Sequence, residues 1–100
     1  MPQSARQGDS VDTGHDCDTT TVLATPSQGS VFVNGILACR LGDLTVSHDI
    51  RVSTVCTPHI ASISGSSSSV YIAGVLAARL GDACDAGSIT TGSSNVYIGG

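Results

Sequence analysis

The side chains in this chain best suited to bind a metal are its three histidines, His15, His48 and His59, and its four cysteines. Imidazole nitrogen and thiolate sulfur are preferred ligands of zinc, and four of them in a tetrahedron close a structural site. Residues 56–59 (Cys-Thr-Pro-His) resemble half of a zinc knuckle, but no second half follows closely. Short-range spacing therefore leaves open whether these side chains bind a metal or are inert.

An internal repeat must position these side chains. Residues 31–43 read VFVNGILACRLGD and residues 70–82 read VYIAGVLAARLGD. The second half of the same unit opens the chain at residues 5–9, and its first half closes the chain at residues 96–100. Two whole units and one divided unit predict a closed ring of three pseudo-equivalent hairpins.

Each unit has the composition of a β-hairpin. Residues 31–33 and 70–72 are β-branched or aromatic, as strands prefer. Asn34-Gly35 is a strong signal for a type I′ turn, and small residues in the return strands allow close approach to a shared axis. Helix formers are scarce and no stretch has helical periodicity. We therefore predict an all-β fold in which residues 5–9 pair with residues 96–98.

The candidate ligands lie in the three connections that follow the Gly-Asp turns. The first connection contains His15 and Cys17, the second contains His48, Cys56 and His59, and the third contains Cys84. A ring of hairpins would bring these connections to one end, where three imidazoles and a thiolate would form a tetrahedral zinc site. With only three aromatic residues the core is thin, so metal binding would also supply folding free energy.

A second repeated constellation is Arg-x-Gly-Asp, at residues 6–9, 40–43 and 79–82. We interpret it as structural: the Gly makes the turn, the Asp side chain bonds nearby backbone amides, and the Arg pairs with a carboxylate across the ring. The pairs His15-Asp16 and His48-Asp49 invite a catalytic interpretation, but no nucleophile sits in a recognisable motif.

Composition narrows the class of partner and the compartment. Four arginines, eight aspartates and no lysine give a net charge of −4, which argues against a nucleic-acid partner. No apolar signal sequence or membrane span is present, so we expect a cytoplasmic protein that leaves the cell by lysis or through a dedicated machine. Two disulfides are therefore the less favoured state of the cysteines, and Cys39 is expected to be a small core residue.

The repeated residues resemble the PAAR-repeat family. The resemblance rests on Ala-Ala-Arg-Leu-Gly-Asp at residues 77–82 and on the Gly-Ser-x-x-Val-aromatic-Ile-x-Gly pattern at residues 92–100, which recurs with one additional serine at residues 65–74. The first letter of the family motif is Leu here, at Leu37 and Leu76, and Cys39 stands where the motif has a small residue such as Ala. These departures fall at packing positions.

The resemblance implies a small cone with pseudo-three-fold symmetry, formed by residues 1–100 as a single domain without an effector extension. It also implies a structural zinc near the vertex, typically held by three histidines and one cysteine. Carried onto this chain, the ligands are His15, His48, His59 and Cys84, with iron as an alternative metal. Either Cys17 or Cys56 would be the candidate to replace a histidine.

The function that the resemblance implies is mechanical rather than enzymatic. One copy would cap the blunt end of a trimeric β-helical spike in a contractile injection machine, such as a phage tail baseplate or a type VI secretion system. Sheath contraction would drive this membrane-piercing tip against the target envelope, with transient membrane contact. A separate effector would travel as non-covalent cargo.

Two other classes of function compete with this interpretation. A small zinc-dependent hydrolase would need an open metal position for water and a general base, for which Asp16 and Asp49 are the candidates. A free-standing β-repeat binding protein would hold no metal and would present a flat repeated face.

Overall fold

The computed structural model describes all 100 residues, which form ten short strands and no helix. This confirms the all-β prediction. The strands are β1 (Ser10–Asp12), β2 (Thr20–Val22), β3 (Phe32–Val33), β4 (Ile36–Leu37), β5 (His48–Val52), β6 (Val55–His59), β7 (Tyr71–Ile72), β8 (Val75–Leu76), β9 (Ala83–Cys84) and β10 (Gly87–Ile89). All pairings are antiparallel: β2-β1-β10-β9 form one sheet, and β3-β4, β5-β6 and β7-β8 form separate hairpins.

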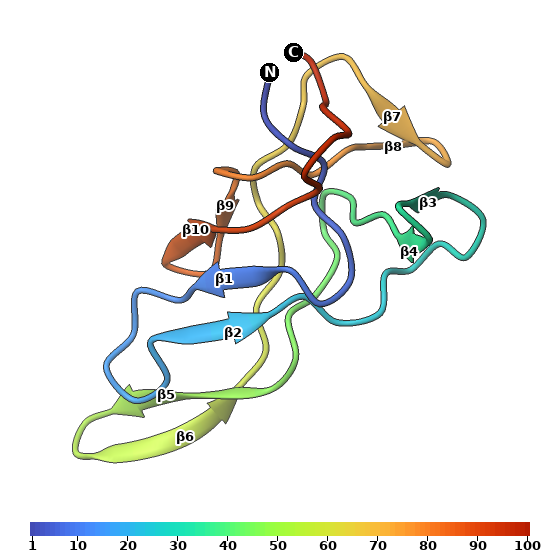
Figure 1. Cartoon of the computed structure of the whole chain (residues 1–100). Coiled ribbons are helices and arrows are strands. Elements are labelled where there is room, and N and C mark those ends of the chain that lie inside the picture. Colours follow the sequence, from blue (N-terminus) through green and yellow to red (C-terminus); the bar gives the residue numbers. More distant parts are fainter.

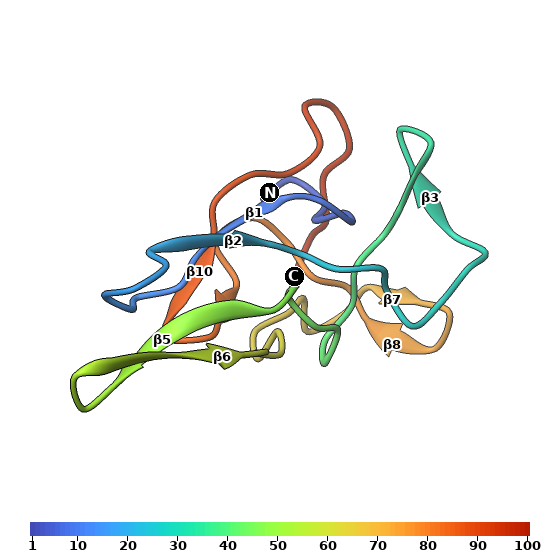
Figure 2. The same cartoon turned by 90° about the horizontal axis from the view of Figure 1, so that it is seen from below.

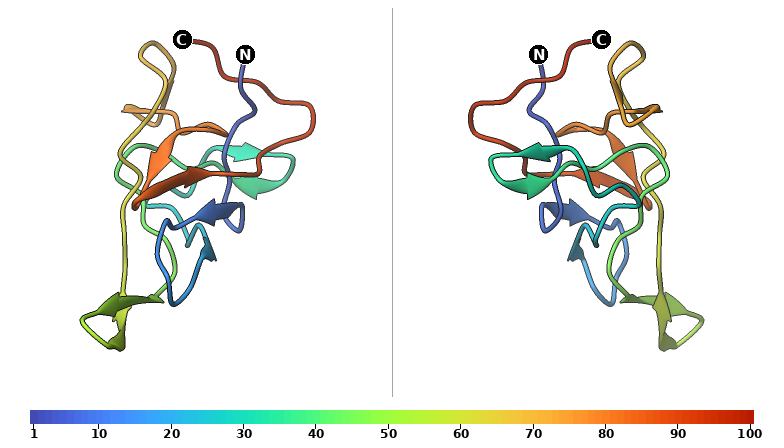
Figure 3. Two further views of the ribbon diagram at one scale, coloured as in Figure 1. Left: turned by 90° about the vertical axis from the view of Figure 1, so that its left-hand side faces the viewer. Right: turned by 90° about the vertical axis from the view of Figure 1, so that its right-hand side faces the viewer.

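The molecule is elongated, with extents of 41 × 24 × 21 Å. The two termini lie at one end, and the β5–β6 hairpin projects at the opposite end (Figure 1). Figure 3 shows the structure narrowing toward that hairpin. Seen from below, β3–β4 and β7–β8 lie on the side away from β5–β6 (Figure 2). We call the end that carries the β5–β6 hairpin the vertex.

Three backbone segments meet on a pseudo-three-fold axis. The amide of Ala5 donates to the carbonyl of Ala78 (3.0 Å), that of Ala78 to Cys39 (3.1 Å), and that of Cys39 to Ala5 (3.0 Å). All three residues are fully buried, and larger side chains would hold the segments apart. This cycle confirms the predicted ring of three units and the core position of Cys39.

The predicted pairing of the two chain ends is corrected by the structure. Gln3 bridges to Tyr97, so the strand partner of residues 96–98 begins before residue 5. Residues 5–9 instead pass the axis at Ala5 and do not pair with residues 96–98. The N-terminal part of the divided unit thus begins before residue 5. The repeat pattern did not reveal this, because Pro2 and Gln3 stand where the other copies have Ile or Val and Leu.

Ser4 occupies the place that Ala38 and Ala77 hold in the other two copies. It is fully buried, and its hydroxyl has no hydrogen-bond partner. Burying an unsatisfied polar group costs about 1–3 kcal/mol. We therefore expect Ser4→Ala to raise the free energy of unfolding by about 1 kcal/mol in urea denaturation. The reverse change at the equivalent position, Ala77→Ser, should lower it, and a stability loss in Ser4→Ala would contradict this packing.

The three Arg-x-Gly-Asp copies have the predicted structural role. In each copy the Asp carboxylate accepts from the backbone amide of the Arg, at 2.7 Å for Arg6–Asp9, 2.8 Å for Arg40–Asp43 and 2.7 Å for Arg79–Asp82. The predicted pairing of Arg with a carboxylate across the ring is wrong. The guanidinium groups of Arg6 and Arg79 pair with the Asp of their own copy, at 3.2 Å and 2.9 Å, because the turn already brings the two side chains together. That of Arg40 instead donates to the hydroxyl of Ser27 and to the carbonyl of Ala73.

The hairpin turns form as predicted. Asn34 and Gly35 both have positive φ (56° and 75°), and so do Ala73 and Gly74 (49° and 85°), as a type I′ turn requires. Each unit also exposes one aromatic side chain, in β3, in β7 and beside the C-terminus, and these segments lie at the end of the molecule away from the vertex (Figure 1). We call this end the base; its aromatic residues are Phe32 (56% exposed), Tyr71 (63%) and Tyr97 (49%).

A buried apolar layer lies next in sequence to the aromatic residues of the base. Val33, Ile72 and Ile98 are the equivalent residues that follow each aromatic, and all three are buried. They form one cluster with Ala38 and Ala77. This buried layer repeats around the axis, and in each copy the exposed aromatic is its neighbour in sequence. None of the chain forms a helix long and apolar enough to cross a bilayer.

Candidate metal site

The three histidines come from two segments near the vertex. His48 opens β5 and His59 ends β6, and the antiparallel register places them directly opposite each other. Directly opposed residues lie side by side on one face of a strand pair. His15 comes from the β1–β2 loop. The ring centroids are 6.0 Å apart for His15–His48, 5.4 Å for His15–His59 and 5.1 Å for His48–His59.

The third connection contributes a carboxylate to this cluster. One oxygen of Asp85, Oδ1, lies 2.6 Å from Nε2 of His15 and 3.3 Å from Nε2 of His59, and Oδ2 lies 2.7 Å from Nε2 of His48. These ligand atoms all lie within 4.8 Å of one another. The three connections thus meet at one cluster that contains all three histidines, and Asp85 is a member of this cluster that the sequence interpretation did not name.

Cys84, the predicted fourth ligand, lies outside this group. Its side chain is fully buried in the core cluster with Val11 and Ile89. Neighbouring residues of a strand point to opposite sides, and the chain turns at Asp85 with φ of 59°, so the carboxylate and not the thiol faces the histidines. Burial, together with the charge of Asp85, raises the pKa of the Cys84 thiol to about 11. The thiol is therefore protonated at neutral pH.

A close backbone contact holds the His15 loop against the turn that carries Asp85. The amide of Ala86 donates to the carbonyl of Thr13 at 3.1 Å. Gly14 has φ of +72°, and a Cβ added there would lie 2.6 Å from the carbonyl oxygen of Ala86. Only glycine readily adopts this positive φ and also has no Cβ to meet the carbonyl oxygen. Gly14 thus sets the distance between His15 and Asp85, and its place next to His15 in the sequence was a signal for this contact.

The hydrogen bonds of His48 favour a cation at the centre of the cluster. Its Nδ1 lies 3.0 Å from the carbonyl oxygen of Val46, to which it donates. With the proton on Nδ1, a neutral imidazole presents a lone pair at Nε2, yet Nε2 faces a carboxylate oxygen that is also an acceptor. A proton or a metal ion between the two resolves this conflict, and an Nδ1–H bond to a carbonyl is the usual support of a metal-bound histidine.

The carboxylate of Asp85 is held in its charged form. Its side chain is 6% exposed, and this burial alone would raise its pKa. Hydrogen bonds to His48 and His15, the nearby charge of His15 and the hydrogen bond to His59 outweigh the burial and lower the pKa. The cluster thus combines three imidazole nitrogens with an ionised carboxylate, a donor set that suits a divalent first-row metal.

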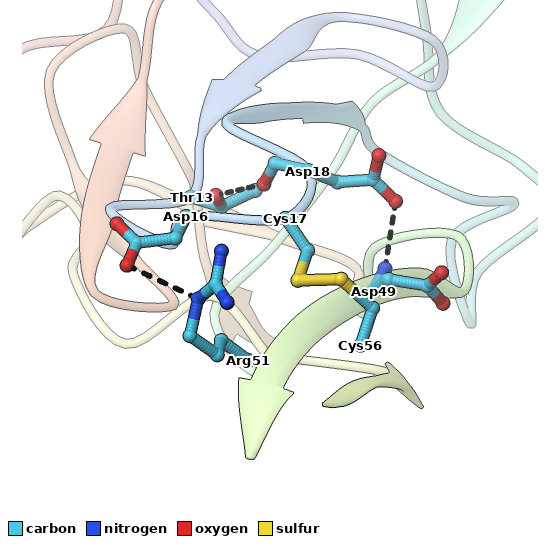
Figure 4. The surroundings of a disulfide bond; sticks show 7 residues. All are labelled: Thr13, Asp16, Cys17, Asp18, Asp49, Arg51 and Cys56. Atoms are coloured by element: carbon cyan, nitrogen blue, oxygen red, sulfur yellow. Dashed lines mark hydrogen bonds and ion pairs between the residues drawn. A yellow bond between two sulfur atoms is a disulfide. The ribbon is translucent and has the colours of Figure 1, made fainter. Parts of the chain in front are cut away.

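A disulfide joins two of the cysteines beside the cluster. Cys17 and Cys56 link the β1–β2 loop to β6 (Figure 4), so neither offers a thiolate in place of a histidine. The sequence interpretation favoured reduced cysteines; the structure has this one disulfide and leaves Cys39 and Cys84 free. Beside the disulfide, Asp18 accepts from the amide of Asp49 at 2.7 Å, which ties the β1–β2 loop to β5 of the same hairpin.

The two candidate general bases lie outside the cluster. The side chain of Asp16 is 77% exposed and pairs with Arg51 at 3.5 Å (Figure 4). Asp49 follows His48 along β5, so its side chain leaves the opposite face of the strand. The carboxylate beside the histidines is that of Asp85, which is hydrogen-bonded to the imidazoles themselves.

The comparison with known families agrees with the repeat and the fold. The family model described as PAAR motif matches residues 13–88, which is more than half of the chain. The chain belongs to the PAAR motif family. PAAR proteins are spike-tip-like proteins of contractile injection systems, found in phage tails and secretion systems. The matched range includes all four residues of the cluster. No curated protein matches this PAAR chain.

The matched range leaves out both parts of the divided unit. The structure nevertheless brings these ends together through the Gln3–Tyr97 bridge. The amide of Ser4 also donates to the carbonyl of Val96 at 2.9 Å. The third copy of this PAAR protein is therefore completed by segments that the family match does not cover.

Proposed function

We propose that this PAAR protein is the membrane-piercing tip of a contractile injection machine, either a phage tail or a type VI secretion system. One copy caps the blunt end of a trimeric β-helical spike. The chain assembles in the cytoplasm and reaches the target envelope when the sheath contracts. The observation that carries this proposal is the base, where three equivalent positions each expose an aromatic side chain.

The symmetry of the base supports a spike of three chains as the partner. A trimer presents three identical surfaces around its axis, and a monomer with a pseudo-three-fold base meets each of them with similar contacts. Phe32, Tyr71 and Tyr97 are 49–63% exposed and are of the residue types enriched in interface hot spots. Their buried valine and isoleucine neighbours make the surface rigid before binding.

A structural metal ion at the vertex would serve this piercing mechanism. We propose that His15, His48 and His59 hold a structural zinc, with Asp85 where Cys84 was expected, and that iron is the alternative metal. The metal joins the β1–β2 loop, the β5–β6 hairpin and the β9–β10 turn at the narrow end. No reaction is needed there: the bound ion resists deformation when force is concentrated on the target membrane.

Replacing the three base aromatics should abolish capping. We expect the triple variant Phe32→Ala, Tyr71→Ala and Tyr97→Ala to bind the trimeric spike protein of its own machine more than about 100-fold more weakly, because each truncated hot spot costs about 2 kcal/mol. Light scattering coupled to size exclusion measures the complex and its stoichiometry, which we expect to be one tip per trimer.

The vertex provides the matched control for this experiment. Val52 and Val55 are as exposed as the base aromatics (52% and 61%) but lie at the other end of the molecule. Val52→Ala with Val55→Ala should leave spike binding unchanged. Three tips per trimer, or full binding by the base variant, would contradict the capping model.

A further inference from the structure

We propose that Asp85 makes the vertex a carboxylate–histidine site that leaves a coordination position open to water. Such a site accepts Fe²⁺, Co²⁺ and Ni²⁺ as well as Zn²⁺. This inference rests on the metal site proposed above and deepens it, because it assigns the coordinating atom of the third connection and the class of ion that follows from it.

The donor atoms at the cluster are all nitrogen and oxygen. The thiol of Cys84 is in the core, and the sulfurs of Cys17 and Cys56 are bonded to each other. Thiolate ligands select soft ions and tetrahedral geometry, whereas imidazole with carboxylate suits a wider range of first-row divalent ions. Without a thiolate, this site lacks the donor that would restrict it to zinc-like ions.

Both oxygens of Asp85 are directed at the imidazoles. Oδ1 faces His15 and His59, and Oδ2 faces His48 at 2.7 Å. An ion bound there would be offered one ligand atom by each of the four residues, all within 4.8 Å of one another, and the second oxygen of Asp85 would be available as a further donor. Ions that prefer more than four ligands gain from this arrangement, while a closed tetrahedral site would exclude them.

Solvent has access to one side of the cluster. The side chains of His59 and His15 are 30% and 20% exposed, whereas that of His48 is 3% exposed. A water molecule can therefore complete the coordination from the side of His59.

Cobalt titration of the purified full-length chain tests this assignment. Native mass spectrometry first establishes whether Co²⁺ or Zn²⁺ binds to the metal-depleted protein. In the visible spectrum, we expect the weak d–d bands of a five- or six-coordinate ion and no sulfur-to-cobalt charge-transfer band. Asp85→Ala should lower Co²⁺ affinity by more than about 100-fold, beyond the 10–100-fold loss typical of an outer-shell residue.

Two variants separate the carboxylate from the neighbouring thiol. Asp85→Cys should introduce the charge-transfer band and raise the preference for Zn²⁺ over Co²⁺. Cys84→Ala should leave the spectrum of the native site unchanged. Asp85→Asn keeps the size of the side chain, and a loss of affinity there shows the role of the charge even where Asp85→Cys folds poorly.

Several results would overturn the assignment. A charge-transfer band in the native protein that disappears in Cys84→Ala would make Cys84 the ligand while leaving the metal site itself intact. Intense tetrahedral bands without sulfur character would show a closed site and remove the open position. Failure of the native chain to bind either ion would overturn the proposed metal site and this inference together.

Discussion

The variant His59→Ala should lose its metal and melt about 15–30 °C below the native protein, since metal that binds only the folded state at about 1,000 times its Kd adds about 4 kcal/mol to stability. His59 closes β6 and faces both His48 and the carboxylate of Asp85. The small core raises the share of stability that such a site supplies. Calorimetry with and without a chelator, together with zinc content, measures the effect.

Two carboxylates near the cluster serve as matched controls for this experiment. Asp16→Asn and Asp49→Asn remove a negative charge from the same loop and hairpin without touching the imidazoles. Both variants should keep full metal content and melt close to the native protein. An unchanged zinc content and melting temperature in His59→Ala would remove this histidine from the site. Loss of metal in the two controls would show that overall charge, rather than ligation, holds the ion.

Removing the disulfide should have an effect of similar size. Cys17 and Cys56 are 39 residues apart in sequence, and a loop of that length gives about 4 kcal/mol of stabilisation by restricting the unfolded chain. We therefore expect Cys17→Ser with Cys56→Ser to lower the free energy of unfolding by about 3–4 kcal/mol. Urea denaturation of metal-depleted protein measures this loss without interference from metal binding.

The reductant itself supplies the control for the disulfide. Dithiothreitol should destabilise the native chain to the level of the double variant and should leave the double variant unchanged. Equal stability of the native and double-variant proteins, both measured without reductant, would mean that the crosslink does not restrict the unfolded chain.

The repeat was the part of this molecule that the sequence determined most fully. Strand composition and Asn34-Gly35 are local signals, and they predicted the hairpins, the ring of three units and the exclusion of helices. Because each histidine follows a Gly-Asp turn, the same repeat also predicted that His15, His48 and His59 would meet at one end. The match to the PAAR motif family over residues 13–88 agrees with this.

The tertiary structure decided the features that depend on register and on the direction of single side chains. Gln3 pairs with Tyr97 although nothing apolar marks the N-terminal strand, since backbone hydrogen bonds do not need apolar side chains. The disulfide joins two cysteines whose separation in sequence says nothing of their distance in space. Arg6 and Arg79 pair with the Asp of their own turns because that partner is already near, whereas Arg40 reaches a carbonyl of another hairpin.

The fourth member of the vertex cluster shows most clearly what the sequence alone could not predict. The sequence located the third connection but not which of two adjacent side chains, Cys84 or Asp85, faces the histidines. That choice depends on the strand alternation of β9 and on the positive φ of one turn residue, which together send the thiol into the core and the carboxylate toward the histidines. Local composition predicts where a turn occurs, but the direction of its side chains follows only from how the turn packs against Gly14 and the core.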